Sequence, residues 1–167
     1  MNTDRNARAV ITTWRAGHVT LSYLSPGGTD PSVGRGWMQA HAERLLGRVA
    51  LAAGEAKEAE RYVHDALSRL APKDFMIDIP ECLDILAAIA AAAESFEEAA
   101  RLLGAAAAGR ERLGIVRFPL EPDFWTGVER TTREAVGDDD YESAFAAGAA
   151  METDEALAYA RRARGVR

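Results

Sequence analysis

The most constraining feature of this sequence is a pattern that occurs twice at a spacing of 40 residues. It covers residues 39–70 and returns over residues 80–109, so that Leu45 corresponds to Ile85. Each copy reads as two amphipathic helices, and Gly54 separates the two helices of the first copy. A helix pair repeated at a fixed period predicts an all-α fold in which the pairs stack as a helical-repeat solenoid.

The chain has 167 residues, which suits a single domain with a sizeable core. We divide this domain into an N-terminal helix with a Gly/Pro-rich loop (1–36), a first repeat (37–72), a second repeat (73–114) and a three-helix cap (115–167). The expected helices cover residues 4–24, 37–53, 55–70, 80–93, 95–113, 122–136, 141–150 and 153–163.

The first helix, over residues 4–24, is predicted from Val10, Trp14, His18 and Leu21, which are spaced three or four residues apart. Threonine and other β-branched residues in the same stretch weaken this prediction. Residues 25–36 hold four glycines and two prolines, so we expect a mobile loop there.

Two local details of the later helices also follow from the sequence. In the helix over 37–53 we expect Leu45, Leu46 and Val49 to face inward. Ser95, either Asp138 or Asp139, and Thr153 are expected to cap the helices that follow them. These residue types accept hydrogen bonds from the first free N–H groups of a helix.

Charge and composition exclude several classes of function. The net charge is −6 and the sequence pI is near 5.1, so direct nucleic-acid binding by this chain alone is not expected. Cys82 is the single cysteine, which excludes an intrachain disulfide. We find neither a secretory signal nor an apolar run that could span a membrane, and we expect a cytoplasmic protein.

The two copies resemble tetratricopeptide repeats. The first copy carries the Leu46-Gly47 pair, small residues at Ala59 and Ala66, and Pro72 after the second helix. In the second copy the glycine is replaced, as Leu86-Ala87. Gly47 would let two helix backbones approach where a larger residue would clash, at a cost of about 1–3 kcal/mol.

A longer resemblance covers residues 54–165, through the segments 54–67, 79–90, 97–118 and 141–165. These segments resemble the C-terminal helical region of large actinobacterial LuxR-type regulators, which also contain an ATPase domain. Phe145 departs from the family, which often has tryptophan there. The sequence lacks the phosphate-binding motif G-x-x-x-x-G-K-[ST], so ATP binding is not carried over and no cofactor is predicted.

In tetratricopeptide arrays the first helix of each pair lines a groove that holds a peptide or a helix. This resemblance implies a partner-binding face, to which we add the tryptophan beside the Gly/Pro-rich loop: Trp37, His41, Arg44, Arg48, Glu81 and Asp84. The alternative is an ordinary solvated helix face with weak ion pairs. His18, His41 and His64 lack metal-site spacing, so we predict neither a metal site nor catalytic residues.

Two functions remain open from the sequence. The first is a non-enzymatic interaction or signal-relay module of a LuxR-type transcriptional regulator. Its partner would be a protein or peptide, including the ATPase and DNA-binding portions of a larger regulator, and a homodimer is also open. The second is a sensing domain for a small-molecule effector, with a pocket between the repeats and the cap.

Overall fold

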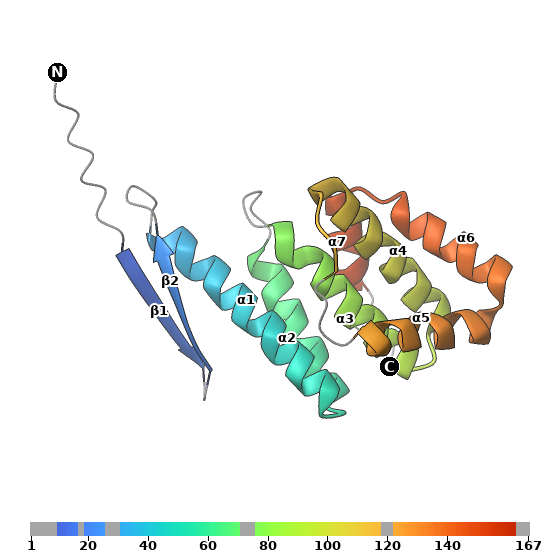
Figure 1. Cartoon of the computed structure of the whole chain (residues 1–167), viewed down its shortest axis with the longest axis horizontal. Coiled ribbons are helices and arrows are strands. Elements are labelled where there is room, and N and C mark those ends of the chain that lie inside the picture. Colours follow the sequence, from blue (N-terminus) through green and yellow to red (C-terminus); the bar gives the residue numbers. More distant parts are fainter. Residues whose placement is uncertain (1–9, 17–18, 26–30, 71–75, 118–121, 163–167) are drawn as a thin grey trace, which may run out of the picture.

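The computed structural model describes residues 10–16, 19–25, 31–70, 76–117 and 122–162. Within these ranges it contains a two-stranded hairpin, seven α-helices and one 3-10 turn. Figure 1 shows the hairpin and α1 at one end of the long axis, α2 and α3 next to them, and α4 to α7 gathered toward the other end. The elements are β1 Val10–Ala16, β2 Val19–Ser25, α1 Pro31–Ala52, α2 Ala56–Arg69, η1 Met76–Asp78, α3 Ile79–Ala92, α4 Phe96–Leu113, α5 Pro122–Val136, α6 Asp138–Ala149 and α7 Thr153–Arg162.

The predicted N-terminal helix over residues 4–24 is wrong in the part that the structure describes, and residues 4–9 and 17–18 lie outside that part. Residues 10–25 contain the antiparallel strands β1 and β2, with Val10 paired to Ser25 and Ala16 paired to Val19. The β-branched and aromatic residues of this stretch favour a strand more strongly than the three-to-four spacing favours a helix. The all-α prediction therefore holds only from α1 onward, and the hairpin packs against α1.

The predicted loop over residues 25–36 is wrong at its C-terminal end. Helix α1 begins at Pro31, where proline fits because the first turn of a helix needs no N–H from it. Residues 31–36 continue directly into the helix that was expected to start at Trp37. Residues 26–30 lie outside the described ranges.

The two predicted helix pairs are confirmed as α1 with α2 and α3 with α4, and α2 also packs on α3. The expected role of Gly47 is confirmed as well. A Cβ atom at Gly47 would lie 2.7 Å from Val63 Cγ2 and 3.2 Å from the Ala59 carbonyl oxygen of α2. Only glycine lets α1 and α2 approach this closely.

Helix α2 turns a fully buried face toward the core, whereas α1 does not turn its expected face inward. Ala59, Val63, Ala66 and Leu67 are fully buried. Val49, expected to face inward, is 66% exposed. Helix α2 packs on the side of α1 that carries Gly47. Val49 is two residues further along α1, which is a rotation of about 200°, so it faces away from α2.

Three helices follow the second pair, as predicted for the cap. Helix α4 packs against α3 and also against α6, and Figure 1 shows α6 at the far end from the hairpin. The predicted cap of α6 by Asp138 or Asp139 is wrong, because the N-cap is Gly137 with φ of 88°. Helix α7 turns back toward α2, where Arg161 Nη2 donates to the Leu67 carbonyl at 3.2 Å.

Helices α4 and α6 cross at two glycines. A Cβ atom at Gly104 would collide with the Phe145 carbonyl, and one at Gly148 would collide with the Arg101 carbonyl. Buried Ala100 and Ala144 lie one turn before the two glycines and cluster with Tyr141. At this glycine crossing the backbones of α4 and α6 lie too close together for a side chain at either glycine.

The single cysteine provides a test of the core. Cys82 is fully buried on α3, and burial raises the pKa of its thiol. Because the thiolate is the reactive form, native protein should react with Ellman's reagent far more slowly than protein in denaturant. Stopped-flow absorbance with and without urea would measure this, and equal rates in both would contradict a closed core around α3.

No helix in the described residues is both long enough and apolar enough to cross a membrane.

Candidate functional site

The residues predicted as a partner-binding face line the seam between α1 and α3. Trp37, His41, Arg44 and Arg48 are spaced by four, three and four residues, so they lie on one side of α1. Glu81 and Asp84 are three residues apart on α3, which packs on α1 and α2. The six residues therefore share one seam, but they differ in their partners and in their exposure.

Two of the predicted residues, His41 and Arg44, meet at Asp78, the last residue of η1. Arg44 Nε donates to Asp78 Oδ1 at 2.8 Å, and His41 Nδ1 lies 3.0 Å from the same oxygen. Arg44 also pairs through Nη1 with the Glu81 carboxylate. The Trp37 and His41 rings lie 5.6 Å apart. Because Arg44 is only 5% exposed, it ties α1 to the start of α3 instead of facing solvent.

Asp78 was not among the predicted residues. It immediately precedes α3, where an aspartate commonly accepts a hydrogen bond from the first turn of the helix. Asp78 holds the N-cap position but makes no such bond, and its carboxylate reaches α1. No local pattern pointed to this contact, because Asp78 lies 34 residues after Arg44 in the sequence.

Asp78 should make stability depend on acid pH. Its burial alone would raise its pKa, but the His41 hydrogen bond and the Arg44 charge outweigh burial and hold the pKa below the usual 3.8. A carboxyl with a lowered pKa stabilises the fold above its unfolded pKa, and this contribution is lost as the pH falls through the folded pKa. The difference in unfolding free energy between wild type and Asp78→Asn should therefore shrink below about pH 4.

Urea unfolding at several pH values measures that difference. Asp139→Asn is the matched control, because Asp139 is an exposed acid in the first turn of α6. A difference that stays constant between neutral pH and about pH 3 would contradict the assignment of Asp78 as an ionised partner of α1.

A second charged cluster surrounds Asp84, which is 1% exposed. Arg110 Nη1 of α4 donates to Asp84 Oδ2 at 2.6 Å. Arg117 donates through Nε to Oδ2 at 3.1 Å and through Nη2 to Oδ1 at 3.0 Å, and its Nη1 reaches Glu129 of α5 at 2.8 Å. Burial raises the pKa of Asp84, and the two guanidinium charges oppose that rise. Asp84 is thus an internal junction of α3, α4 and α5, formed with two arginines that sequence reasoning missed.

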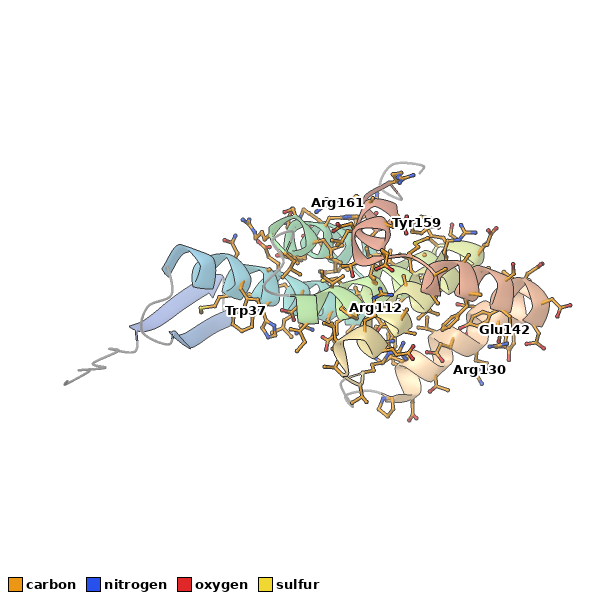
Figure 2. The ribbon with its side chains drawn as sticks, turned by 90° about the horizontal axis from the view of Figure 1, so that it is seen from above. Trp37, Arg112, Arg130, Glu142, Tyr159 and Arg161 are labelled. Atoms are coloured by element: carbon orange, nitrogen blue, oxygen red, sulfur yellow. The ribbon has the colours of Figure 1, made fainter. Side chains whose placement is uncertain are left out.

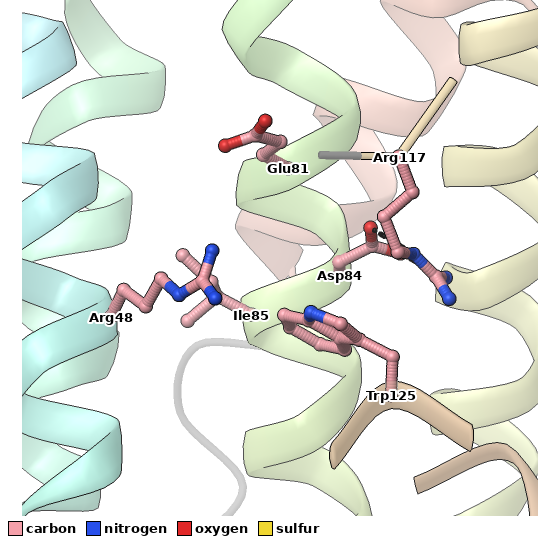
Figure 3. A pocket seen from close by; sticks show the side chains of 6 residues that line it. All are labelled: Arg48, Glu81, Asp84, Ile85, Arg117 and Trp125. Atoms are coloured by element: carbon pink, nitrogen blue, oxygen red, sulfur yellow. Dashed lines mark hydrogen bonds and ion pairs between the residues drawn. The ribbon is translucent and has the colours of Figure 1, made fainter. Parts of the chain in front are cut away.

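Trp125 of α5 covers the end of the seam. Together with Arg48, Glu81, Asp84, Ile85 and Arg117 it lines a niche of about 10 Å³, room for roughly one water molecule (Figure 3). The indole is 5% exposed. The Arg48 guanidinium carbon lies 6.0 Å from its ring centre and that of Arg117 lies 5.3 Å away, both within the range of cation–π attraction.

The six predicted residues therefore divide into two groups. Arg44 and Asp84 are buried within ion networks and are not available to a partner. Trp37, His41, Arg48 and Glu81 keep part of their surface exposed. Whether this exposed part binds a partner remains a prediction.

The histidines add little chemistry. In the ranges that the structure describes, no group of three His, Cys, Asp or Glu side chains could hold a metal ion. His64 is 5% exposed, and its Nε2 lies 3.8 Å from Glu60 on the same helix. His18 lies outside those ranges.

Known proteins similar to this chain come from mycobacteria. The chain is 41% identical over 132 residues to proteins of Mycobacterium tuberculosis and Mycobacterium bovis, each named "Putative HTH-type transcriptional regulator". The match covers 79% of this chain but only 15% of each relative. No protein-family model and no solved structure matches the sequence. The predicted connection to transcriptional regulators is confirmed at this level.

Proposed function

We propose that this chain is a non-enzymatic, tetratricopeptide-like relay module of an HTH-type transcriptional regulator of the LuxR type. It contacts a protein partner through the exposed part of the α1 face, formed by Trp37, His41, Arg48 and Glu81. The partner surface is another portion of the regulator, such as its ATPase or DNA-binding part, and the setting is the cytoplasm.

The observation that carries this proposal is the similarity to transcriptional regulators. The match covers only 15% of each regulator, as expected for one module of a larger protein. Two features of the α1 face support it. The face joins charges of both signs to an aromatic ring, as the contact surfaces of proteins often do. Its buried members, Arg44 and Asp84, hold it rigidly, and a rigid surface loses less entropy on binding.

The relay role can be tested in a chimera. In the Mycobacterium tuberculosis relative, the matching segment is replaced by the corresponding part of this chain, and regulated transcription is measured with a reporter. We expect the chimera to regulate and Arg48→Glu to reduce regulation severalfold, because the reversed charge repels acidic groups that Arg48 would attract.

Arg130→Glu is the control, since Arg130 is an exposed arginine of α5, toward the opposite end of the molecule from Trp37 (Figure 2). Circular dichroism melts must show that both variants fold. If Arg48→Glu and Arg130→Glu regulate equally well, the α1 face is not the contact surface.

A second candidate function is the sensing of a small-molecule effector. The observation that favours it is a cleft of about 270 Å³ where α3, α4 and α7 meet. This position lies between the second repeat and the cap, where a pocket for an effector is the alternative expectation from the sequence. Its volume approaches the lower end of the range for small-molecule sites.

A further inference from the structure

The cleft between α3, α4 and α7 has an apolar interior and a charged rim. The start of α3 contributes Ile79, Pro80 and Leu83, and the second half of α4 contributes Ala105 and Gly109. Ala156 closes it from α7, while Arg112, Leu113, Glu152 and Thr153 stand at its edge. An apolar interior with a few polar groups at its edge is typical of a site for a small organic molecule.

The cleft exists because three helix ends meet there. Helix α3 begins at Ile79, α4 ends at Leu113 and α7 begins at Thr153. Ala105, Gly109 and Ala156 carry little or no side chain into the space between these ends. Leucine or phenylalanine at these positions would occupy part of that volume.

The rim carries one charge of each sign. Arg112 lies in the last turn of α4, and Glu152 directly precedes α7. In the parts of the chain that the structure describes, neither the Arg112 nor the Glu152 side chain takes part in an ion pair or hydrogen bond, although both line one cleft. The Glu152 backbone N–H donates to Glu155 Oε2 at 3.0 Å, which fixes the backbone from which the Glu152 side chain extends.

We propose that this cleft binds a free α-amino acid with an apolar side chain. Arg112 pairs with the carboxylate, Glu152 pairs with the ammonium group, and the side chain lies among Leu83, Ala105 and Ala156. A ligand with both charges leaves neither rim group without a partner, whereas a simple fatty acid would bring its carboxylate near Glu152. The inference rests on the effector-sensing candidate and names its ligand class.

The test uses three probes that share one branched apolar body. L-leucine carries both charges, 4-methylpentanoate lacks the ammonium group, and 3-methylbutylamine lacks the carboxylate. Binding to the whole chain is followed by titration in two-dimensional NMR and by calorimetry. We expect L-leucine to bind saturably and about tenfold more tightly than either analogue, because each analogue loses one charge-assisted hydrogen bond.

Four variants locate the site. Arg112→Ala and Glu152→Gln should each weaken the binding of L-leucine about tenfold. Arg112→Ala should remove the preference for L-leucine over 3-methylbutylamine, and Glu152→Gln should remove the preference over 4-methylpentanoate. Both residues are exposed, so neither change should unfold the protein. Ala105→Leu should abolish binding by filling the interior, and Arg130→Ala, the exposed control on α5, should leave it unchanged (Figure 2).

The outcomes separate the two levels of the proposal. Equal binding of all three probes, abolished by Ala105→Leu, would overturn the amino-acid assignment and leave the sensing candidate standing. Binding of L-leucine that survives Arg112→Ala and Glu152→Gln would overturn the assignment as well. If none of the probes binds, the amino-acid assignment fails, while the relay role is decided independently by the chimera.

Discussion

Replacing Gly148 by alanine should lower the free energy of unfolding by about 3 kcal/mol, the upper part of the range for overpacking a core. The added Cβ would collide with the carbonyl of Arg101 in α4, and a backbone group cannot rotate away as a side chain can. Gly104→Ala should have a similar effect, because its Cβ would collide with the carbonyl of Phe145. Either change forces α4 and α6 apart.

The matched control is Gly127→Ala on α5, where an added Cβ meets nothing within 4 Å. Alanine forms helices better than glycine by about 1 kcal/mol, so this variant should be unchanged or more stable. For a chain of this size, the melting temperature should fall by roughly 2–4 °C for each kcal/mol of lost unfolding free energy. Equal melting temperatures for Gly148→Ala and Gly127→Ala would contradict the close crossing of α4 and α6.

Asp84→Asn should lower the free energy of unfolding by about 3 kcal/mol, as expected when one partner of a buried ion pair is removed. Arg110 and Arg117 would keep their charges beside a neutral amide, and Arg110 is only 8% exposed. The side chain keeps its size, so the loss measures charge and hydrogen bonding instead of packing. Urea unfolding at neutral pH gives the value.

Glu129→Gln tests the outer end of the same network. Glu129 pairs with Arg117, but its side chain is 43% exposed, so this change should cost under about 1 kcal/mol. Similar losses for Asp84→Asn and Glu129→Gln would mean that Asp84 does not act as a buried junction.

The helix pairs could be predicted because their signals agree at every level. Gly47, Ala59 and Val63 follow a helical period, and the structure places all three where α1 meets α2. In residues 10–25 two signals compete. The spacing of Val10 and Trp14 suits a helix, whereas the density of β-branched residues suits strands, and the register from Val10 to Ser25 shows that the strand preference prevails.

The candidate site could be predicted as a helix face but not as a set of exposed residues. Periodicity places Arg44 and Asp84 on the correct sides of α1 and α3. It gives no information on what covers them, which is Asp78 from the connecting turn and Arg117 with Trp125 from beyond the second repeat. Such contacts depend on how distant segments pack, and a local pattern does not contain that information.

The sequence contains a weak signal for the crossing of α4 and α6. Ala100 and Gly104 are four residues apart, as are Ala144 and Gly148, so each helix carries a stripe of small residues along one side. Either stripe alone is ordinary in an alanine-rich chain. Their meaning appears only when the two stripes face each other, as α4 and α6 do.

The return of α7 to α2 changes how this chain should lose its structure. A simple stack of helix pairs makes contacts only between neighbours and can unravel from an end. Here Arg161 bonds to Leu67 across a separation of 94 residues, and Ala160 shares one apolar cluster with Ala40 and Val63. Opening the last helix therefore exposes the first pair as well. From α1 to α7 the chain should melt in one cooperative step, with coincident transitions reported by helix content and by tryptophan fluorescence.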